Sequence, residues 1–330
     1  MTFILHVGTH KTGTTSIQHF FRKNDKLLRE RGIWYPNYNI INKAKRYAHH
    51  EVAHAIAGKS KNISFENVKS FITKINNSTA LDEKILISAE PFYRHHVGSS
   101  TKRTLWADKE TYIKRVSQLF GSDSEIIFVL RRQDYFAASL YQENIKVNRY
   151  AKSFTSFKNE YMHYFDYYRN IKLWNKHFDK IKVLIFEDLI ANNSLEYDFC
   201  KALGVSDFDD FKTPSIKNES LHPYLIEFKR LVNGSPLSLS KLDEIKNNML
   251  NSSPEKAAEF PVIEYCWHNS DSRDAFLDLF IESNKLIHDE YISLNRNSLF
   301  SETKVKNKTS FTKLSECQYI EYLKHYVTSG

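Results

Sequence analysis

Residues 6–21 read HVGTHKTGTTSIQHFF, and this stretch decides the fold. The apolar segment Phe3-Ile4-Leu5 precedes it and favours a strand, while Ile17, Phe20 and Phe21 recur after it at helical spacing. A strand that turns through two glycines into a helix is a common way to bind phosphate, because the backbone N–H groups at the start of the helix point at the anion. The sequence therefore predicts an anion-binding loop between a first strand and a first helix.

The lysine of this loop stands in an unusual place. In the common nucleotide-binding loop a lysine follows the second glycine directly, whereas here Thr14 follows Gly13 and Lys11 lies inside the loop. Backbone N–H groups, several hydroxyl groups and a mobile ammonium group together favour an oxyanion site, because a simple helix cap needs no such combination. The candidate binding residues are Lys11, Thr12, Gly13, Thr14, Thr15 and Ser16.

Short apolar runs with many β-branched residues recur along the chain, and helical patterns lie between them. Such runs are typical of parallel strands that are covered on both faces. Strands that alternate with helices predict an α/β fold with three layers and a mainly parallel central sheet, where ligands bind at the carboxyl ends of the strands. The predicted strands are residues 3–7, 84–88, 125–130 and 181–186, and the predicted helices include residues 14–31 and 195–203.

The predicted domain organisation is a single α/β domain over residues 1–300. Residues 37–82 and 222–275 are mostly polar-helical in pattern, and we expect them to be helical insertions that cap the sheet and shape a binding cleft. The remaining segment, 301–330, is rich in Lys, Ser and Thr, and we expect a partly disordered tail.

Composition narrows the classes of protein and partner. The chain has 330 residues, of which 41% are hydrophobic, so it is long enough for a substantial core. Its net charge of +8 favours anionic partners, but the positive residues are scattered, which speaks against nucleic acid as the partner. Contact with a membrane surface and the homo-oligomeric state stay open.

The cysteines and the N-terminus favour a cytoplasmic protein. Cys200, Cys266 and Cys317 are far apart and fit neither a zinc spacing nor a disulfide framework, so we expect reduced thiols. The chain passes from Met1 directly into a strand, without the basic and apolar regions of a signal peptide, and we expect no membrane-spanning helix.

A second anion site is predicted after the third strand. The stretch FVLRRQDYFAASLYQ covers residues 128–142, with Arg131 at the end of the strand and Ser139 inside the helix that follows. A guanidinium group at the carboxyl end of a strand suits a bidentate contact with phosphate. The Ser139 hydroxyl has little structural reason to lie two turns into a helix, so we expect it to bind the same group.

These features resemble the motifs of the sulfotransferase superfamily. The 5′-phosphosulfate loop of that family has the pattern K-[ST]-G-T-T-[ST/W], which stands here as residues 11–16. Its 3′-phosphate motif, an Arg followed by a Ser eight residues later, stands here as Arg131 and Ser139. Further similarities, several of them to the bacterial polysaccharide-type branch, are the Arg-Arg-Gln triplet at 131–133, FEDL at 186–189, CKALGV at 200–205, Asn218-Glu219-Ser220 and Ser283-Asn284.

The resemblance implies transfer of a sulfuryl group from 3′-phosphoadenosine 5′-phosphosulfate (PAPS) to a hydroxyl group of a glycan or glycolipid, with release of 3′,5′-ADP. The loop 11–16 would hold the 5′ end of the donor, and Arg131 and Ser139 would hold the 3′-phosphate. Lys11 would assist the leaving phosphate, since negative charge builds on the bridging oxygen. A sulfuryl group carries less charge than a phosphoryl group, so no metal ion is expected. The Arg-Lys-Gly segment of the small-molecule members is absent, which disfavours a small phenol as acceptor.

The acceptor hydroxyl needs a general base, and Glu90 is the first candidate. Glu90 directly follows the second predicted strand and would project toward the same edge of the sheet. Glycan sulfotransferases carry a catalytic glutamate in a similar place. His54 is the second candidate for the base, or a residue that contacts the acceptor.

Three further functions compete with this interpretation. The segment His50-Glu51-Val52-Ala53-His54 has the pattern of a zinc hydrolase, with two histidines one turn apart and a glutamate beside the first. Its continuation lacks the longer zinc-protease signature, and no carboxylate is clearly placed as a third ligand. The second competing function is a P-loop kinase, which Thr14 disfavours, and the third is a nucleotide-binding protein without catalytic activity.

Overall fold

We describe a computed structural model of the chain, which divides into two compact units. The first unit comprises residues 1–132, 166–216 and 282–300, and the second comprises 133–165, 217–281 and 301–330. Each unit is described by itself. The structure describes residues 2–80, 82–99, 101, 103–191, 194–213, 221–251, 263–267, 269–292, 296–301, 309–310 and 314–327, so the Asn218-Glu219-Ser220 segment lies outside it.

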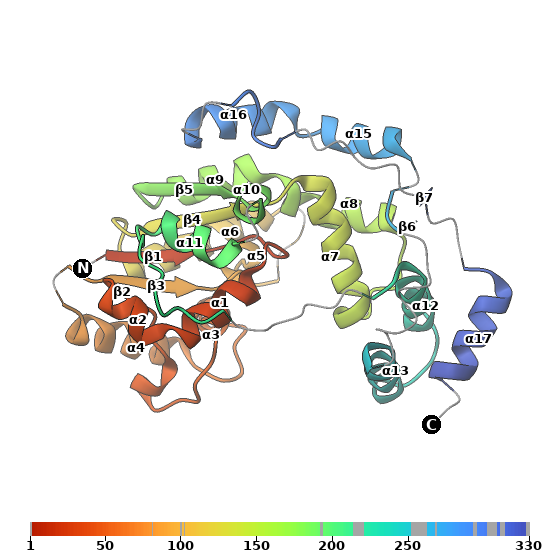
Figure 1. Cartoon of the computed structure of the whole chain (residues 1–330), viewed down its shortest axis with the longest axis horizontal. Coiled ribbons are helices and arrows are strands. Elements are labelled where there is room, and N and C mark those ends of the chain that lie inside the picture. The colour runs from red at the N-terminus through yellow and green to blue at the C-terminus, as the bar shows by residue number, and fades with distance from the viewer. Residues whose placement is uncertain are drawn as a thin grey trace. The chain divides into compact units, whose positions relative to one another are not determined.

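The first unit contains a five-stranded parallel sheet with the order β2-β3-β1-β4-β5 (Figure 1). The predicted α/β class with a parallel sheet is confirmed, and each of the predicted strands lies within one residue of its observed position. The edge strand β2 is only two residues long and was not predicted. The strands are β1 (Thr2–His6), β2 (Ile33–Trp34), β3 (Lys84–Ser88), β4 (Glu125–Leu130) and β5 (Lys180–Ile185).

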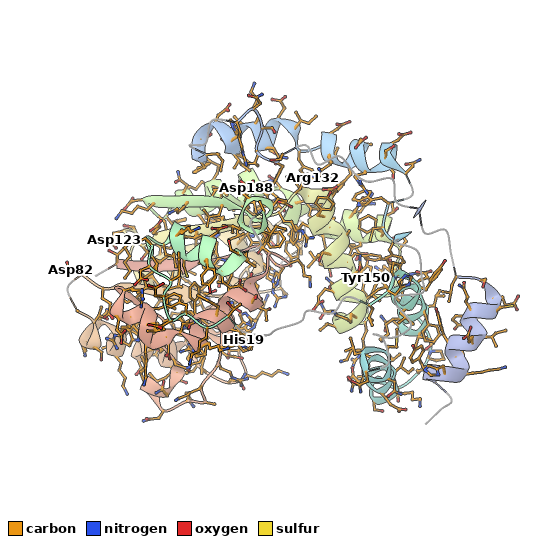
Figure 2. All side chains as sticks on the ribbon, viewed as in Figure 1. His19, Asp82, Asp123, Arg132, Tyr150 and Asp188 are labelled. Carbon is orange, nitrogen blue, oxygen red and sulfur yellow. The ribbon has the colours of Figure 1, made fainter. Side chains whose placement is uncertain are left out.

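Helices cover both faces of this sheet, and Figure 2 shows the side chains that fill the space between the helices and the strands. On one face, Ile4 and Ile127 pack in a single buried cluster with Phe20 of helix α1. On the other face, the Phe3 ring contacts the Phe120 ring at the end of α6, with ring centroids 5.2 Å apart. Successive strand residues point to opposite faces, and nearly all residues of β1, β3 and β4 are buried, so each strand contributes to both cores.

The helices of the first unit alternate with the strands. The predicted helix over 14–31 is interrupted at Asn24, whose side-chain amide donates to the Phe20 carbonyl and whose side-chain oxygen accepts from the Lys212 N–H. These bonds end α1 and begin α2. The helices are α1 (Thr14–Lys23), α2 (Asp25–Glu30), η1 (Tyr38–Ile41), α3 (His50–Ile56), α4 (Phe65–Ser78), α5 (Pro91–Arg94), α6 (Leu105–Phe120), α9 (Tyr167–Asn175), α10 (Phe186–Ile190), α11 (Leu195–Ala202) and, apart from its first residue, α16 (Ile281–Tyr291).

The strand order places a binding edge at the end of β1. β1 lies between β3 and β4, and the chain after β1 crosses to one side of it before β4 forms on the other. At such a reversal the loops after neighbouring strands diverge, which leaves room for a ligand at the carboxyl ends. The segment 7–13 follows β1 and therefore lies at this position.

The second unit is mainly helical, and α7 is central to it. Helices α8, α12 and α15 all contact α7. The ring of Phe165 contacts the rings of Phe136 on α7 and Phe276 on α15, with centroid distances of 5.6 and 5.5 Å. The elements are α7 (Gln133–Asn148), α8 (Phe154–Phe165), α12 (Pro223–Asn233), α13 (Leu239–Asn251), β6 (Ile263–Glu264), α15 (Ser270–Asp278), β7 (Thr309–Ser310) and α17 (Glu316–Tyr326).

The expected domain division, with one domain over 1–300 and a tail over 301–330, stays a prediction. Among the described residues, no helix combines the length and the apolar character that crossing a membrane requires.

Candidate functional site

The loop after β1 continues the strand pairing before it turns. The N–H groups of Val7 and Thr9 donate to carbonyl groups of β4, at Ile127 and Val129, with distances of 3.0 and 2.9 Å. The Thr12 hydroxyl then donates to the Thr9 carbonyl at 2.7 Å. These bonds fix both the start and the middle of the loop.

Left-handed backbone conformations make the turn tight. Lys11 and Gly13 have φ angles of 65° and 69°. A non-glycine residue with positive φ is uncommon, so the central lysine is held in a conformation that the surrounding loop must stabilise. At Gly13 a Cβ atom would also lie 2.3 Å from Cδ2 of Leu195, so this position has both a conformational and a steric reason to be glycine.

The start of α1 suits an anion. Gly13 is the N-cap residue, no side chain caps the first turn, and the first turn contains no acidic residue. The first N–H groups of a helix have no partner within it, and they carry a partial positive charge. The residues present at Gly13, Thr14 and Thr15 therefore fit a phosphate group.

The hydroxyl groups of the predicted loop differ in their surroundings. Thr12 and Thr14 are buried, and their hydroxyl oxygens lie 3.3 Å apart. The Ser16 hydroxyl donates to the carboxylate of Glu196 at the start of α11. Ser16 therefore binds a neighbouring helix, whereas Thr12 and Thr14 stay within the loop.

Arg131 contacts the loop directly. Its Nη1 atom donates to the Lys11 carbonyl at 2.9 Å, and its guanidinium carbon lies 5.2 Å from the centroid of the Phe186 ring. The Tyr167 hydroxyl donates to the Arg131 carbonyl at 2.7 Å. The structure thus brings two predicted residues, Arg131 and Lys11, together. Ser139 lies on α7 in the second unit, and its pairing with Arg131 stays a prediction.

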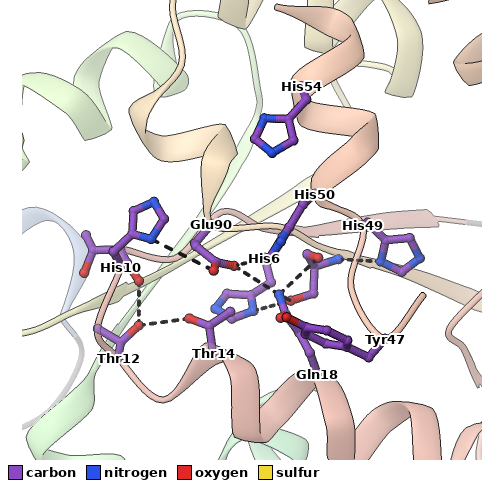
Figure 3. A network of polar contacts seen from close by, with 12 residues as sticks. His6, His10, Thr12, Thr14, Gln18, Tyr47, His49, His50, His54 and Glu90 are labelled. Carbon is purple, nitrogen blue, oxygen red and sulfur yellow. Dashed lines mark hydrogen bonds and ion pairs between the residues drawn. The ribbon is translucent and has the colours of Figure 1, made fainter. Parts of the chain in front are cut away.

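Glu90 is buried beside the same loop. It precedes α5, and a Cβ atom on Gly8 would lie 3.0 Å from the Glu90 Cβ, so the loop passes very close to this residue. Gln18 Nε2 and His50 Nε2 donate to Glu90 Oε2 at 3.1 and 2.8 Å, and His10 Nδ1 lies 3.9 Å from Oε1 (Figure 3). The carboxylate therefore joins the loop, α1 and α3.

This network keeps Glu90 ionised. Burial alone would raise the pKa of Glu90, but the hydrogen bond from His50 and the charges of His50 and His10 lower it well below its ordinary value. Burial lowers the pKa of His10 to about 4, although Glu90 opposes this effect. His10 is therefore neutral at neutral pH and adds no charge there. We assign the low pKa of Glu90 mainly to the hydrogen bond from His50.

Three buried polar atoms of the Glu90 network have no hydrogen-bond partner among the described residues. They are Nε2 of His6, Nε2 of His10 and Oε1 of Gln18. Unpartnered buried polar atoms are uncommon in folded proteins and indicate either a bound ligand or ordered water. The Glu90 network therefore has the properties of a binding site as well as those of a packed core.

The zinc pattern at 50–54 is divided among separate partners. His50 binds Glu90, and His54 Nδ1 shares a hydrogen bond of 2.7 Å with His95 Nε2. The Glu51 carboxylate accepts from Ser60 and Asn62, at 2.6 and 2.7 Å. No group of acidic, histidine and cysteine side chains that could bind a metal ion is found in the described ranges. The contacts of Glu51 explain this residue as a structural one that fixes the turn after α3.

Several residues of this site were not predicted from the sequence. His6, His10, Gln18 and His50 all belong to the Glu90 network, and only Glu90 itself was predicted. Gln18 follows Thr14 by one helical turn, so its position on the face of α1 toward the loop could have been found from the spacing. The histidines gave no comparable signal.

Comparisons with known proteins give weak similarities. No family model matches the chain. The chain is 28% identical, over 187 residues, to an uncharacterized protein of Archaeoglobus fulgidus. This match covers 56% of the chain and 50% of that protein, so the chain spans about half the length of the curated relative.

Two solved structures are similar in fold. One is a sulfotransferase from Alicyclobacillus acidocaldarius, with a TM-score of 0.40, 15% identity, and coverage of 79% of this chain and 99% of that one. The other is the sulfotransferase domain from the curacin biosynthetic pathway, with a TM-score of 0.38, 12% identity, and coverage of 84% and 96%. Both neighbours are sulfotransferases. The TM-scores and identities are low, and a function for this chain therefore has to be argued from its own residues.

Proposed function

We propose that the chain is a sulfotransferase that moves a sulfuryl group from PAPS to a hydroxyl group of a glycan or glycolipid, and releases 3′,5′-ADP. The observation that carries the proposal is the contact of Arg131 with the Lys11 carbonyl, which joins the two candidate phosphate-binding elements at one edge of the sheet. A donor with phosphate groups on both sides of one ribose requires two neighbouring anion sites. The motif order in the sequence supports the same donor.

The loop would bind the 5′ end of the donor. The N–H groups at the start of α1 and the hydroxyl groups of Thr12 and Thr14 are hydrogen-bond donors that suit phosphate oxygens. Lys11 lies in the middle of the turn, where its ammonium group can neutralise charge on the leaving phosphate oxygen. PAPS supplies an activated sulfuryl group, and the loop lowers the barrier by stabilising the charge that develops as this group departs.

Glu90 would take the proton of the acceptor hydroxyl. Its Oε2 atom accepts from both Gln18 and His50, whereas Oε1 lies 3.9 Å from His10 Nδ1. Oε1 is therefore the oxygen that we assign to the acceptor proton. The low pKa of Glu90 keeps the carboxylate ionised at neutral pH, as a base must be. His54, which binds His95, remains the second candidate as base or acceptor contact.

The competing functions predict different ligands. A P-loop kinase would prefer ATP with Mg²⁺. A zinc hydrolase would use Glu51 as its base, but this carboxylate accepts hydrogen bonds from Ser60 and Asn62. A non-catalytic nucleotide-binding protein would bind 3′,5′-ADP and transfer nothing.

A thermal-shift panel of 3′,5′-ADP, ADP and AMP without metal tests the proposal. We expect the largest stabilisation with 3′,5′-ADP, because only this nucleotide has a 3′-phosphate for Arg131. Arg131→Ala should remove the preference, Arg131→Lys should weaken it, and Arg103→Ala, at an exposed site, should leave it unchanged. An equal response to ADP and 3′,5′-ADP would contradict the proposal.

A further inference from the structure

A basic cluster lies next to the Glu90 network in the first unit. It consists of His54 on α3, Lys59 in the turn after α3, Arg94 at the end of α5, and His95, the residue after α5. Lys59 is exposed, Arg94 and His54 are half-buried, and His95 is buried. The two segments are separated by about forty positions in the chain, so the fold, and not the local sequence, brings them together.

Direct contacts connect the cluster to Glu90. The rings of His54 and His95 lie 4.9 Å apart and share the hydrogen bond between Nδ1 and Nε2. The His54 ring lies 6.5 Å from the ring of His50, the residue that donates to Glu90 (Figure 3). A chain of side chains therefore leads from Glu90 through His50 to the basic cluster.

Within the part of the chain that the structure describes, neither the Lys59 nor the Arg94 side chain forms an ion pair or a hydrogen bond with a carboxylate. The two carboxylates that act on His54 already accept hydrogen bonds, Glu51 from the turn after α3 and Glu90 from His50. Cations that gather without ion-pair partners repel one another, and such a group favours the binding of an anion.

The protonation of the histidines reflects this repulsion. Burial, then the charges of His54, Arg94 and Lys59, lower the pKa of His95 to about 2. Burial and then Arg94 lower the pKa of His54, against the opposing charges of Glu51 and Glu90. In the neutral pair one N–H lies between the two rings, so one ring keeps an N–H for an anion, and protonation supplies a second.

Further charged groups lie on the side of His96. His96 lies beside His95, and its pKa is lowered by burial, raised by a bond to the Val97 carbonyl and by Asp108, and lowered by Lys59 and Lys109. Asp108 and Lys109 therefore have opposite effects on His96.

We propose that Lys59, Arg94, His54 and His95 bind an anionic substituent, a carboxylate or a sulfate ester, on the sugar acceptor. The inference rests on the proposed function for the identity of the acceptor, and it names the class of glycan: an acidic one. The acceptor hydroxyl would approach Glu90 while the anionic substituent lies over α3 and α5. Neutral glycans would lack the contact with the cluster.

Binding of an anion at this cluster should be coupled to proton uptake by its histidines. A bound anion stabilises the charged imidazolium forms, so it raises the pKa values of His54 and His95 and binding takes up protons. The pKa of His54 lies below its ordinary value of about 6.5 and that of His95 is about 2, so binding of the acidic glycan should strengthen as the pH falls below about 6.5. A neutral glycan should show no such dependence.

Calorimetric titration of the full chain with defined tetrasaccharides tests the inference. The probes are a neutral tetrasaccharide, one with uronate carboxylates and one with sulfate esters, each titrated with 3′,5′-ADP present and absent. We expect one of the acidic probes to bind more tightly than the neutral one. Arg94→Gln and Lys59→Ala should each weaken that binding by about tenfold, since a charge-assisted contact is lost.

Matched controls separate this site from others. Lys61→Ala removes an exposed lysine two positions from Lys59 and should leave the affinity unchanged. The affinity of 3′,5′-ADP should not change in the Arg94 and Lys59 variants, so failure of the donor proposal and failure of this inference give different results. Equal binding of neutral and acidic probes, unchanged affinity in both variants, or equal binding of an RNA oligonucleotide of the same charge would overturn the inference.

Discussion

Two neighbouring regions of the first unit are built in different ways. The loop region, residues 7–16, is shaped by backbone geometry: a left-handed lysine, two left-handed glycines and hydrogen bonds to its own carbonyl groups and to β4. The glutamate region, formed by Glu90, His50, His10 and Gln18, is shaped by ionisable and polar side chains from separate segments. A site made by the backbone conformation of one loop tolerates few residue types at its fixed positions. A network of side chains can be assembled from many different residues and segments.

The two regions meet at Gly8. Its small size lets the loop pass within van der Waals distance of Glu90, with a Cβ contact of 3.0 Å if a side chain were added. In the proposed reaction, the loop region stabilises the leaving group and the glutamate region takes the acceptor proton. Substitutions confined to one region therefore separate these contributions.

The largest effect is expected for Glu90→Gln. The amide cannot accept the acceptor proton, so transfer should fall by about 10²–10⁴-fold. The affinity for 3′,5′-ADP should stay the same, because Glu90 belongs to the glutamate region. Transfer of labelled sulfate and calorimetric binding measure the two quantities. Full activity of the variant would remove Glu90 from the reaction.

Substitution of His50 should change the pH dependence of both activity and stability. His50→Ala removes the hydrogen bond that lowers the pKa of Glu90, whereas His50→Gln can retain a donor without charge. We expect the acid limb of the pH–rate profile to move to higher pH in His50→Ala, and less in His50→Gln. An identical profile for wild type and both variants would show that His50 does not control Glu90.

The lowered pKa of Glu90 also makes the free energy of unfolding depend on pH. The pKa of Glu90 is lowered in the folded protein, so its contribution is present above the unfolded pKa of about 4 and is lost as the pH falls through the lower folded value. His50→Ala should therefore reduce the free energy of unfolding most at neutral pH, and the difference from wild type should shrink in acid. Urea denaturation at several pH values measures this.

Gly13→Ala tests the loop region alone. The substitution places a Cβ atom at a left-handed position and against Leu195, and should lower the free energy of unfolding by about 1–2 kcal/mol. Gly98→Ala is the matched control, since Gly98 has a φ of 65° but no atom within 4 Å of the added Cβ. A smaller loss at Gly13 than at Gly98 would contradict the packing that we describe.

The smallest effect is expected for Glu51→Gln. The carboxylate accepts from Ser60 and Asn62 at the surface, so the loss of stability should be about 1 kcal/mol, with no change in sulfuryl transfer. A zinc hydrolase would lose its activity with this substitution and with a chelator. The two measurements therefore separate sulfuryl transfer from zinc-dependent hydrolysis.

The sequence predicted the backbone of the loop region better than the contacts of the glutamate region. The physical reason is the distance along the chain between the residues that interact. Gly13 and Lys11 adopt conformations that depend on residues close to them in the chain, and the continuous apolar runs identified the central strands. β2 was missed because two residues form no periodic pattern. The break at Asn24 was missed because its side chain binds Lys212, which lies far away in the sequence.

Glu90 was predicted from its position after a strand, and helical spacing could have placed Gln18 toward the loop, but neither pattern shows that Gln18 and His50 bind Glu90. His50 and Gln18 reach Glu90 from α3 and α1, and a sequence pattern does not show which helix faces which strand end. The pattern around His50 instead suggested zinc, because the spacing of two histidines and a glutamate does not depend on where their side chains bind. Tertiary contacts, and not the local spacing, decide between these interpretations.

A crystal structure of the chain with 3′,5′-ADP tests the central claim most directly. The account predicts the 5′-phosphate within hydrogen-bond distance of the N–H groups at Gly13, Thr14 and Thr15, and the 3′-phosphate at the Arg131 guanidinium group. A nucleotide bound elsewhere, or one whose 3′-phosphate does not contact Arg131, would contradict it.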